Sequence, residues 1–202
     1  MPTLSFGETV DVGYTPFARL SLQSEGATAV WIVADFLHVL DAAYRSIWVF
    51  ERSLATSAWL VKSNVGAGAA GDRHLSLLLN AVPPMERLLL TAVEFHSPGI
   101  WEFIGKLNPL EVIRLAINDA HERRKDREYR ETAEQRRLEL ENAIREAGLL
   151  KEQIELAKAM GATKNDLREL LDGLVYRPLL RLTNYSERAS IHSAEIEETE
   201  RE

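Results

Sequence analysis

The sequence predicts an α+β fold, in which a small antiparallel sheet of about four strands packs on a helix, followed by a long projecting helix and a short C-terminal helix. Three observations support it. Short segments alternate apolar and polar side chains, one apolar segment between them has helical spacing, and residues 108–161 have helical character throughout. We expect a head domain at 1–107, a long helix or coiled coil at 108–161, a C-terminal helical segment at 162–185 and a disordered acidic tail at 186–202.

Four segments are predicted to be strands. Phe17–Gln23 (FARLSLQ) alternates apolar and polar residues, which indicates a half-buried strand. His74–Asn80, Arg87–His96 and Ile100–Ile104 are the other three, and the last two form a hairpin through a Pro-Gly turn. The structural residues of this hairpin are Phe95, Ser97, Pro98, Gly99, Trp101 and Phe103.

The segment 27–50 is strongly apolar, with aromatic residues at helical spacing. Asp35, Asp41 and Arg45 interrupt it, and a bilayer span needs about 20 residues with few or no charges. We therefore expect a buried core helix. The alternative is a membrane-surface or pore-forming effector that uses this helix, because the segment is rich in tryptophan and phenylalanine.

The start of the long helix has several local signals. Asn108 is a good N-cap residue, Pro109 suits the first helical position, and Glu111 stands where a capping box places its acid. From His121 to Arg137 the apolar content nearly vanishes, and opposite charges recur at helical spacing. This stretch is predicted to be a solvated, salt-bridged helix and not a nucleic-acid site, because acidic residues nearly match the basic ones.

An apolar seam returns beyond this shaft, with an arginine filling its gap at 136 or 137. Its members, which we expect to carry oligomerisation, are Tyr129, Ala133, Leu140, Ile144, Ala147, Leu150, Ile154 and Ala157. A second arrangement also fits: the helix packs back on its own domain or on the C-terminal segment. Gly148 lies inside the seam and marks a kink, a close helix contact or a break.

Gly161 is predicted to end the long helix, and Thr163 and Asp166 to cap the next one. Leu167, Leu170, Leu171 and Leu174 then give a short amphipathic helix. Pro178 argues against its continuation. Residues 186–202 contain six glutamates and few apolar side chains, which predicts disorder.

Composition excludes several kinds of site. The chain has no cysteine, so it has no disulfide, no thiolate metal site and no cysteine nucleophile. Its net charge of −7 argues against a mainly electrostatic nucleic-acid binder. The five histidines show no metal-binding spacing, and the glycine pattern at 66–71 lacks the following helix that a dinucleotide site needs. We expect no catalytic residue, no metal, no cofactor and a cytoplasmic protein.

The run from Val93 to Phe103 (VEFHSPGIWEF), followed by Gly105, Leu107-Asn108-Pro109 and a long charged helix, resembles a group of bacterial conflict-system proteins. These are similar to prokaryotic relatives of the N-terminal domain of TRADD, an adaptor in death-receptor signalling. The resemblance covers residues 87–160 and implies a ferredoxin-like fold and a non-enzymatic adaptor that contacts other proteins in bacterial defence. It transfers no functional residue.

Overall fold

The computed structural model describes residues 16–25, 29–55, 82–94, 98–125, 133–146, 148, 150–159 and 161–199. Its centre is a four-stranded antiparallel sheet in the order β2-β3-β1-β4. The strands are β1 (Phe17–Ser24), β2 (Leu89–Glu94), β3 (Gly99–Lys106) and β4 (Ile191–Thr199). The predicted α+β class with a four-stranded antiparallel sheet is therefore confirmed.

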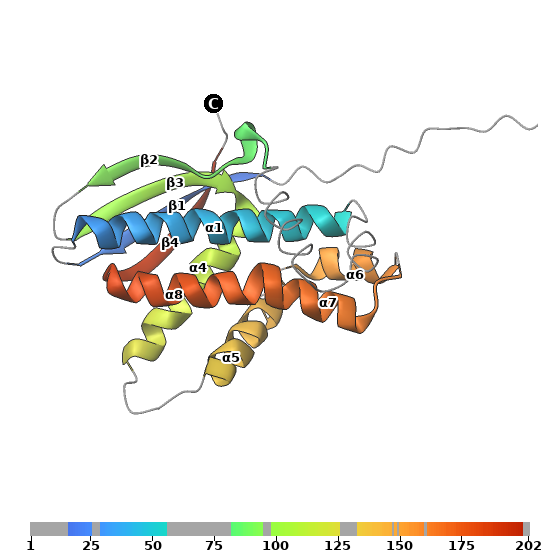
Figure 1. Cartoon of the computed structure of the whole chain (residues 1–202). Helices are drawn as coiled ribbons and strands as arrows, with labels where there is room; N and C mark the ends of the chain where they lie inside the picture. Colours follow the sequence, from blue (N-terminus) through green and yellow to red (C-terminus); the bar gives the residue numbers. More distant parts are fainter. Residues whose placement is uncertain are drawn as a thin grey trace, which may run out of the picture.

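Helices cover one face of this sheet (Figure 1). Alternation along β1 and β3 turns Leu20, Leu22, Trp101 and Phe103 into the core, where each is at most 3% exposed, while the residues between them face the other side. The strands predicted at 17–23, 87–96 and 100–104 correspond to β1, β2 and β3. The strand predicted at 74–80 and the glycine loop before it lie outside the described residues.

The long apolar helix α1 (Val30–Ala55) packs on this inner face. The Phe36 and Trp101 rings pack in a tilted arrangement with centroids 5.6 Å apart, and Tyr44, Ile47 and Phe50 are fully buried. The expectation of a core helix is met. Because the aromatic residues of α1 point into the protein except Trp31, the described structure gives little support to the membrane-surface alternative.

A single tyrosine fixes the distance between α1 and the sheet. The Tyr44 hydroxyl donates to the backbone oxygen of Glu86 at 2.8 Å and accepts from the backbone N–H of Lys106 at 2.9 Å. Glu86 belongs to the short helix η1 (Pro84–Glu86), and its carboxylate accepts from Trp48 Nε1 at 2.6 Å. A Cβ on Gly105 would lie 2.8 Å from the Tyr44 ring, so only glycine fits there.

The predicted continuous helix at 108–161 is wrong, because the structure divides this stretch. The helices are α4 (Leu107–Lys125), α5 (Ala133–Glu146) and α6 (Lys151–Ala159). Gly148 has φ +70° and Leu150 has φ 62°, so the chain turns between α5 and α6, and the break is one of the outcomes left open for Gly148. The stretch folds onto the rest of the chain and does not project as one rod (Figure 1).

The apolar seam packs within the chain itself. Leu140, Ile144, Leu150 and Ala157 are each at most 4% exposed and belong to the same core as α1 and α4, with Ile154 packed against it. This is the second arrangement that the sequence left open. Tyr129 and Ala147 lie outside the described residues, and Ala133 begins α5. The described seam residues that are buried here are therefore not a preformed surface for another copy.

The C-terminal helix continues through Pro178, contrary to the prediction. It runs from α7 (Lys164–Leu171) through a π-helical turn, η2 (Asp172–Tyr176), into α8 (Arg177–Arg188). A proline within an α-helix clashes with the carbonyl four residues earlier. The wider π turn just before Pro178 accommodates its ring, and so the helix is not broken there.

The predicted disordered tail is also corrected, because Ile191–Thr199 forms strand β4 beside β1. The Asn118 side chain of α4 donates to the backbone oxygen of Ala194 at 2.9 Å and accepts from its N–H at 2.8 Å. Ile191 and Ala194 are buried, whereas the glutamates at 195, 197 and 198 are exposed. The acidic composition therefore predicted disorder, although the few apolar residues of this strand face the core.

Candidate functional site

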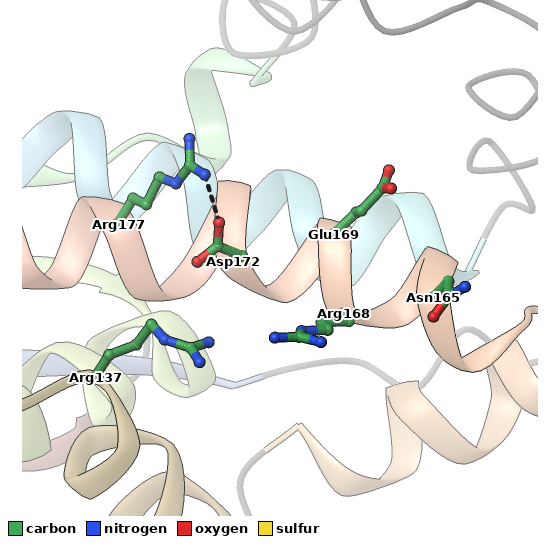
Figure 2. Close-up of a pocket in the computed structure, with 6 residues that line it drawn as sticks. All are labelled: Arg137, Asn165, Arg168, Glu169, Asp172 and Arg177. Carbon is green, nitrogen blue, oxygen red and sulfur yellow. Dashed lines mark ion pairs between the residues drawn. The ribbon is translucent and has the colours of Figure 1, made fainter. Parts of the chain in front are cut away.

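A polar cavity of about 550 Å³ lies between α5 and the helix formed by α7 and η2. Figure 2 shows the side chains that line the cavity. All of them are polar or charged: Arg137, Asn165, Arg168, Glu169, Asp172 and Arg177. Three of the six are arginines in a protein whose net charge is −7. The other charged lining residues are two acids, so the lining has a small positive formal charge on an acidic molecule.

The α7 side of the cavity follows from helical periodicity. Leu167 and Leu170 are buried, and the residues at 165, 168, 169 and 172 form the opposite, polar stripe of the same helix. The start of α7 is fixed by the predicted capping box: the Thr163 hydroxyl accepts from the Asp166 N–H at 3.2 Å, and the Asp166 carboxylate accepts from the Thr163 N–H at 2.9 Å. Thr163 and Asp166 thus perform the predicted role.

The π turn brings the last two lining residues together. Asp172 and Arg177 are five residues apart, and the Arg177 N–H donates to the Asp172 carbonyl across the widened turn. Their side chains form an ion pair of 2.7 Å, although Arg177 is 75% exposed. Asp172 therefore holds an exposed guanidinium at the rim of the cavity. Isolated π turns of this kind occur frequently at functional sites.

Arg137 lies on the α5 side, with only 16% of its side chain exposed. The Glu141 carboxylate lies 3.9 Å from it, and the same carboxylate is closer to Arg145, at 2.7 Å. Nearby, burial and then the Glu141 charge raise the pKa of Tyr176 to about 12, so this phenol stays neutral. The carboxylate of Glu141 thus lies between two arginines of α5.

Figure 2 shows the guanidinium groups of Arg137 and Arg168 directed toward one another, while the Glu169 carboxylate points away. Within the part of the chain that the structure describes, Arg168 forms no ion pair. Like charges repel one another, and on the α5 side the Glu141 carboxylate offsets part of this repulsion. The arrangement can bind an anionic group, and Asn165 adds a neutral amide beside it.

The residues singled out from the sequence are placed elsewhere, mostly in the core. Trp101 and Phe103 are buried on the inner face of β3, which begins at Gly99 directly after Pro98, whereas Phe95 and Ser97 lie outside the described residues. None of the described hairpin or seam residues lines the cavity. They build the scaffold around it.

The expected helix cap has a different role from the one predicted. Helix α4 begins at Leu107, and Asn108 lies close to the Glu51 carboxyl of α1. Glu111 accepts from Arg114 Nε at 2.6 Å, one turn onward, and Pro109 is buried. Burial raises the pKa of Glu51 to about 8, against the lowering effects of Asn108 and Lys106. These groups join α4 to α1.

The sequence interpretation did not single out the cavity residues. Arg137 stands in the gap of the predicted apolar seam, and the polar stripe of α7 was not predicted to be a binding surface. An arginine that interrupts an apolar seam was the available signal, because a buried helix face tolerates a guanidinium only where it reaches a partner or a cavity. The pairing of Arg137 with Arg168 could not be found without knowing that the helices pack together.

The described residues contain no cluster of three or more histidine or acidic side chains placed to hold a metal ion. Of the helices that the structure describes, none is long and apolar enough to cross a membrane. Comparison of the chain with protein-family models, with curated proteins and with solved structures finds no match.

Proposed function

We propose that this protein is a non-enzymatic protein–protein interaction module, an adaptor, whose arginine-lined cavity receives an acidic segment of a partner protein. One observation carries the proposal: Arg137 and Arg168 direct their guanidinium groups toward one another from two different helices. A guanidinium is the side chain best suited to binding oxyanions, because its planar fork donates two parallel hydrogen bonds.

The lining supports a protein segment over a small organic ligand. Pockets for small molecules are lined mainly by apolar and aromatic side chains with a few polar groups. Here every lining residue is polar or charged. A volume of about 550 Å³ holds several side chains of a bound peptide, and the exposed Arg177 at the rim can contact the segment on either side of the anchored group.

The order of the described elements also supports this reading. The chain passes through β1, α1, β2, β3, α4 and finally β4, with β1 and β3 in the middle of the sheet. This order fits the ferredoxin-like arrangement. It agrees with the resemblance to adaptor domains of bacterial conflict systems, and we propose a role in bacterial defence on that resemblance alone. Further helices are inserted between α4 and β4, and two of them, α5 and α7, form the cavity.

The proposal does not include self-association through the apolar seam. Leu140, Ile144, Leu150 and Ala157 already pack within one chain. If the adaptor forms homo-oligomers, they use other surfaces, and light scattering at tens of micromolar protein measures their mass.

The proposal is tested with an array of nine-residue peptides in which glutamate and aspartate replace zero to six positions of a glycine-serine sequence. Fluorescence anisotropy then gives the affinity of the best acidic peptide and of its glutamine-asparagine counterpart. We expect the wild type to bind the acidic peptide at least tenfold more tightly. The double variant Arg137→Ala/Arg168→Ala should lose that preference, and Arg181→Ala, which removes an exposed arginine of α8 outside the cavity, should keep it. Equal binding by all three proteins would refute the proposal.

A further inference from the structure

We infer that the outer edge of strand β2 pairs with the same edge of a second copy of this chain. The two β2 strands run antiparallel about a two-fold axis between Leu90 and Thr91, and they join two four-stranded sheets into one sheet. This surface lies apart from the arginine-lined cavity, so the inference goes beyond the proposed function and does not rest on it. It is carried by the contrast between the two edges of the sheet and by the charge pattern of the segment 87–94.

The β4 edge of the sheet is protected against pairing. Helix α4 lies against this strand, and its Asn118 amide bonds both the carbonyl and the N–H of Ala194, at 2.9 Å and 2.8 Å. That amide thus occupies backbone groups that a further strand would use. The glutamates of β4 at 195, 197 and 198 are exposed and would repel the same strand of another copy. Both features are known ways of blocking an edge strand.

The β2 edge has much weaker protection. Among the strands that the structure describes, β2 pairs with β3 alone, and Figure 1 shows it at the outside of the sheet. Leu89 and Leu90 are 42% and 48% exposed. The strand contains neither lysine nor proline, which natural proteins place on edges to prevent pairing. An exposed edge with apolar side chains is a template for another strand.

A β-bulge in the middle of β2 determines which register is possible. The pairing with β3 shifts between Leu90 and Ala92, and the Thr91 hydroxyl donates to the Glu102 carbonyl at 3.2 Å. Leu90 and Val93 are three residues apart, yet both lie opposite buried aromatic residues of β3 and so share the core face. The alternation of faces is therefore reversed from one half of the segment to the other.

The apolar residues match in the register that crosses this bulge. Leu88 lies opposite Val93 of the second copy, and both of these side chains pack on the core face. Leu89 lies opposite Ala92 of the second copy, and both stand on the outer face, because they pair with Ile104 and Glu102 of β3. Every apolar contact across the axis thus joins residues of the same face.

The charges select the same register. Arg87 and Glu94 are the two charged residues of the segment RLLLTAVE, and both are exposed. In the proposed register Arg87 lies opposite Glu94 of the second copy at each end of the paired segment. Both residues also make contacts within their own chain, for example from Arg87 Nε to the Val82 carbonyl at 3.2 Å. The register therefore needs only the attraction of opposite charges, whereas like charges in these positions would destabilise it. A segment complementary to itself forms a closed two-fold interface.

The inference is tested by sedimentation velocity on the full chain, over a range of concentrations up to tens of micromolar. A paired edge of eight residues is a small interface, so we expect a reversible equilibrium between monomer and dimer. Arg87→Glu and Glu94→Arg should each weaken dimerisation at least tenfold, because each change places like charges at both ends of the interface. An equimolar mixture of the two variants should recover the dimer, because every Arg87–Glu94 position then carries opposite charges again.

Controls separate this edge from the rest of the molecule. Glu195→Arg changes an exposed charge on β4, and Arg137→Ala/Arg168→Ala changes the cavity, and both proteins should dimerise as the wild type does. Circular dichroism shows whether each variant is folded. Leu89→Lys is the second variant if Arg87→Glu fails this check, because Leu89 is exposed and lysine on an edge opposes pairing.

Each outcome supports or overturns the inference. A wild-type protein that remains a monomer at tens of micromolar would overturn it. A wild-type dimer that persists in the folded Glu94→Arg and Leu89→Lys variants would also overturn it, because the copies would then meet on another surface. If the mixture of the two charge variants stayed monomeric, the antiparallel register would be refuted. None of these results alters the binding of acidic peptides to the cavity, which is measured separately.

Discussion

Two interfaces of this molecule differ in polarity: α1 packs on the sheet through apolar side chains, whereas charged side chains lie between α5 and α7. Where α1 meets the sheet, the contacts are apolar and closely packed, and the Tyr44 hydroxyl between them has a partner on each side. Where α5 meets α7 and η2, buried leucines hold the helices together, but charged side chains surround an open cavity beside them. The Tyr44 hydroxyl is thus paired on both sides in one region, whereas arginine side chains face each other in the other.

The difference indicates what each region contributes. An interface with satisfied polar groups and close packing stabilises the fold. Two arginine side chains directed toward one another contribute less to stability, because like charges repel. Strain or repulsion that a fold retains is often a property of a binding site. Substitutions on the two sides test this difference.

The largest loss of stability is expected from a substitution of the buried apolar residues of α5, which hold this helix beside the cavity. Ile144 of α5 is 3% exposed. Ile144→Asp buries an unpaired carboxylate and removes apolar contacts, and we expect a loss of about 4 kcal/mol or more in the free energy of unfolding, enough to prevent folding. Leu138→Asp is the matched control, because Leu138 lies on the same helix and is 47% exposed. Thermal unfolding by circular dichroism compares the two.

The same substitution tests how the seam is used. A folded Ile144→Asp protein whose mass falls in light scattering, relative to a larger wild-type mass, would show that the seam joins copies of the chain. The arrangement in which the seam packs within one chain would then be incorrect.

The second effect comes from the carboxyl group buried beside α4. Burial raises the pKa of Glu51 from 4.5 to about 8, so the folded protein keeps this proton at pH values where the unfolded chain releases it. Its contribution to stability is therefore complete below pH 4.5 and is lost as the pH rises to about 8. The slope is at most about 1.4 kcal/mol per pH unit.

Glu51→Gln should remove this slope. Urea unfolding at pH values from 4 to 9 should show the variant gaining on the wild type as the pH rises, with Glu187→Gln on the exposed surface of α8 as the control. Parallel stability curves for the Glu51→Gln variant and the wild type would mean that the carboxyl is ionised in the folded protein.

The sequence predicted the apolar side of the molecule better than the charged side, for a physical reason. Alternation in FARLSLQ and IWEFI reports directly which face of a strand is buried, and it gave β1 and β3. The strand β4 was missed because its inward residues, Ile191 and Ala194, are few among glutamates. A composition argument averages over the faces of a strand, whereas burial depends on one face only.

The charged side depended on contacts that no local pattern contains. The capping residues Thr163 and Asp166 act within one helical turn and were identified correctly. The continuous helix was wrong because the turn at Gly148 is stabilised by packing of the seam against α1 and α4. Pro178 was predicted to break the helix, but the π turn before it accommodates the proline ring. The cavity follows from both of these features, and so it could not be derived beforehand.

The third prediction concerns the stability change on replacing one glycine from each side, Gly105 beside the sheet and Gly173 in the π turn, by alanine. A Cβ at Gly105 would lie 2.8 Å from the Tyr44 ring, which is fully buried and held by two hydrogen bonds, so the ring cannot move away. We expect Gly105→Ala to lower stability by about 1–3 kcal/mol. A Cβ at Gly173 in the π turn would meet no atom within 4 Å. Gly173→Ala should raise stability by about 0.5 kcal/mol, because it restricts the unfolded chain. Equal losses for both variants in urea unfolding would contradict the assignment of close packing to the sheet side alone.

The smallest effect is expected at the residue with the largest role in binding. Arg168 is exposed, forms no ion pair with another described residue and faces Arg137. Arg168→Ala should change the free energy of unfolding by no more than about 0.5 kcal/mol in low salt, with a gain in stability if the repulsion dominates. Added phosphate should raise the melting temperature of the wild type and not that of the variant, because a ligand stabilises only the state that binds it. A substantial loss of stability in Arg168→Ala without phosphate would show that the arginine supports the fold, and the contrast between the two sides would disappear.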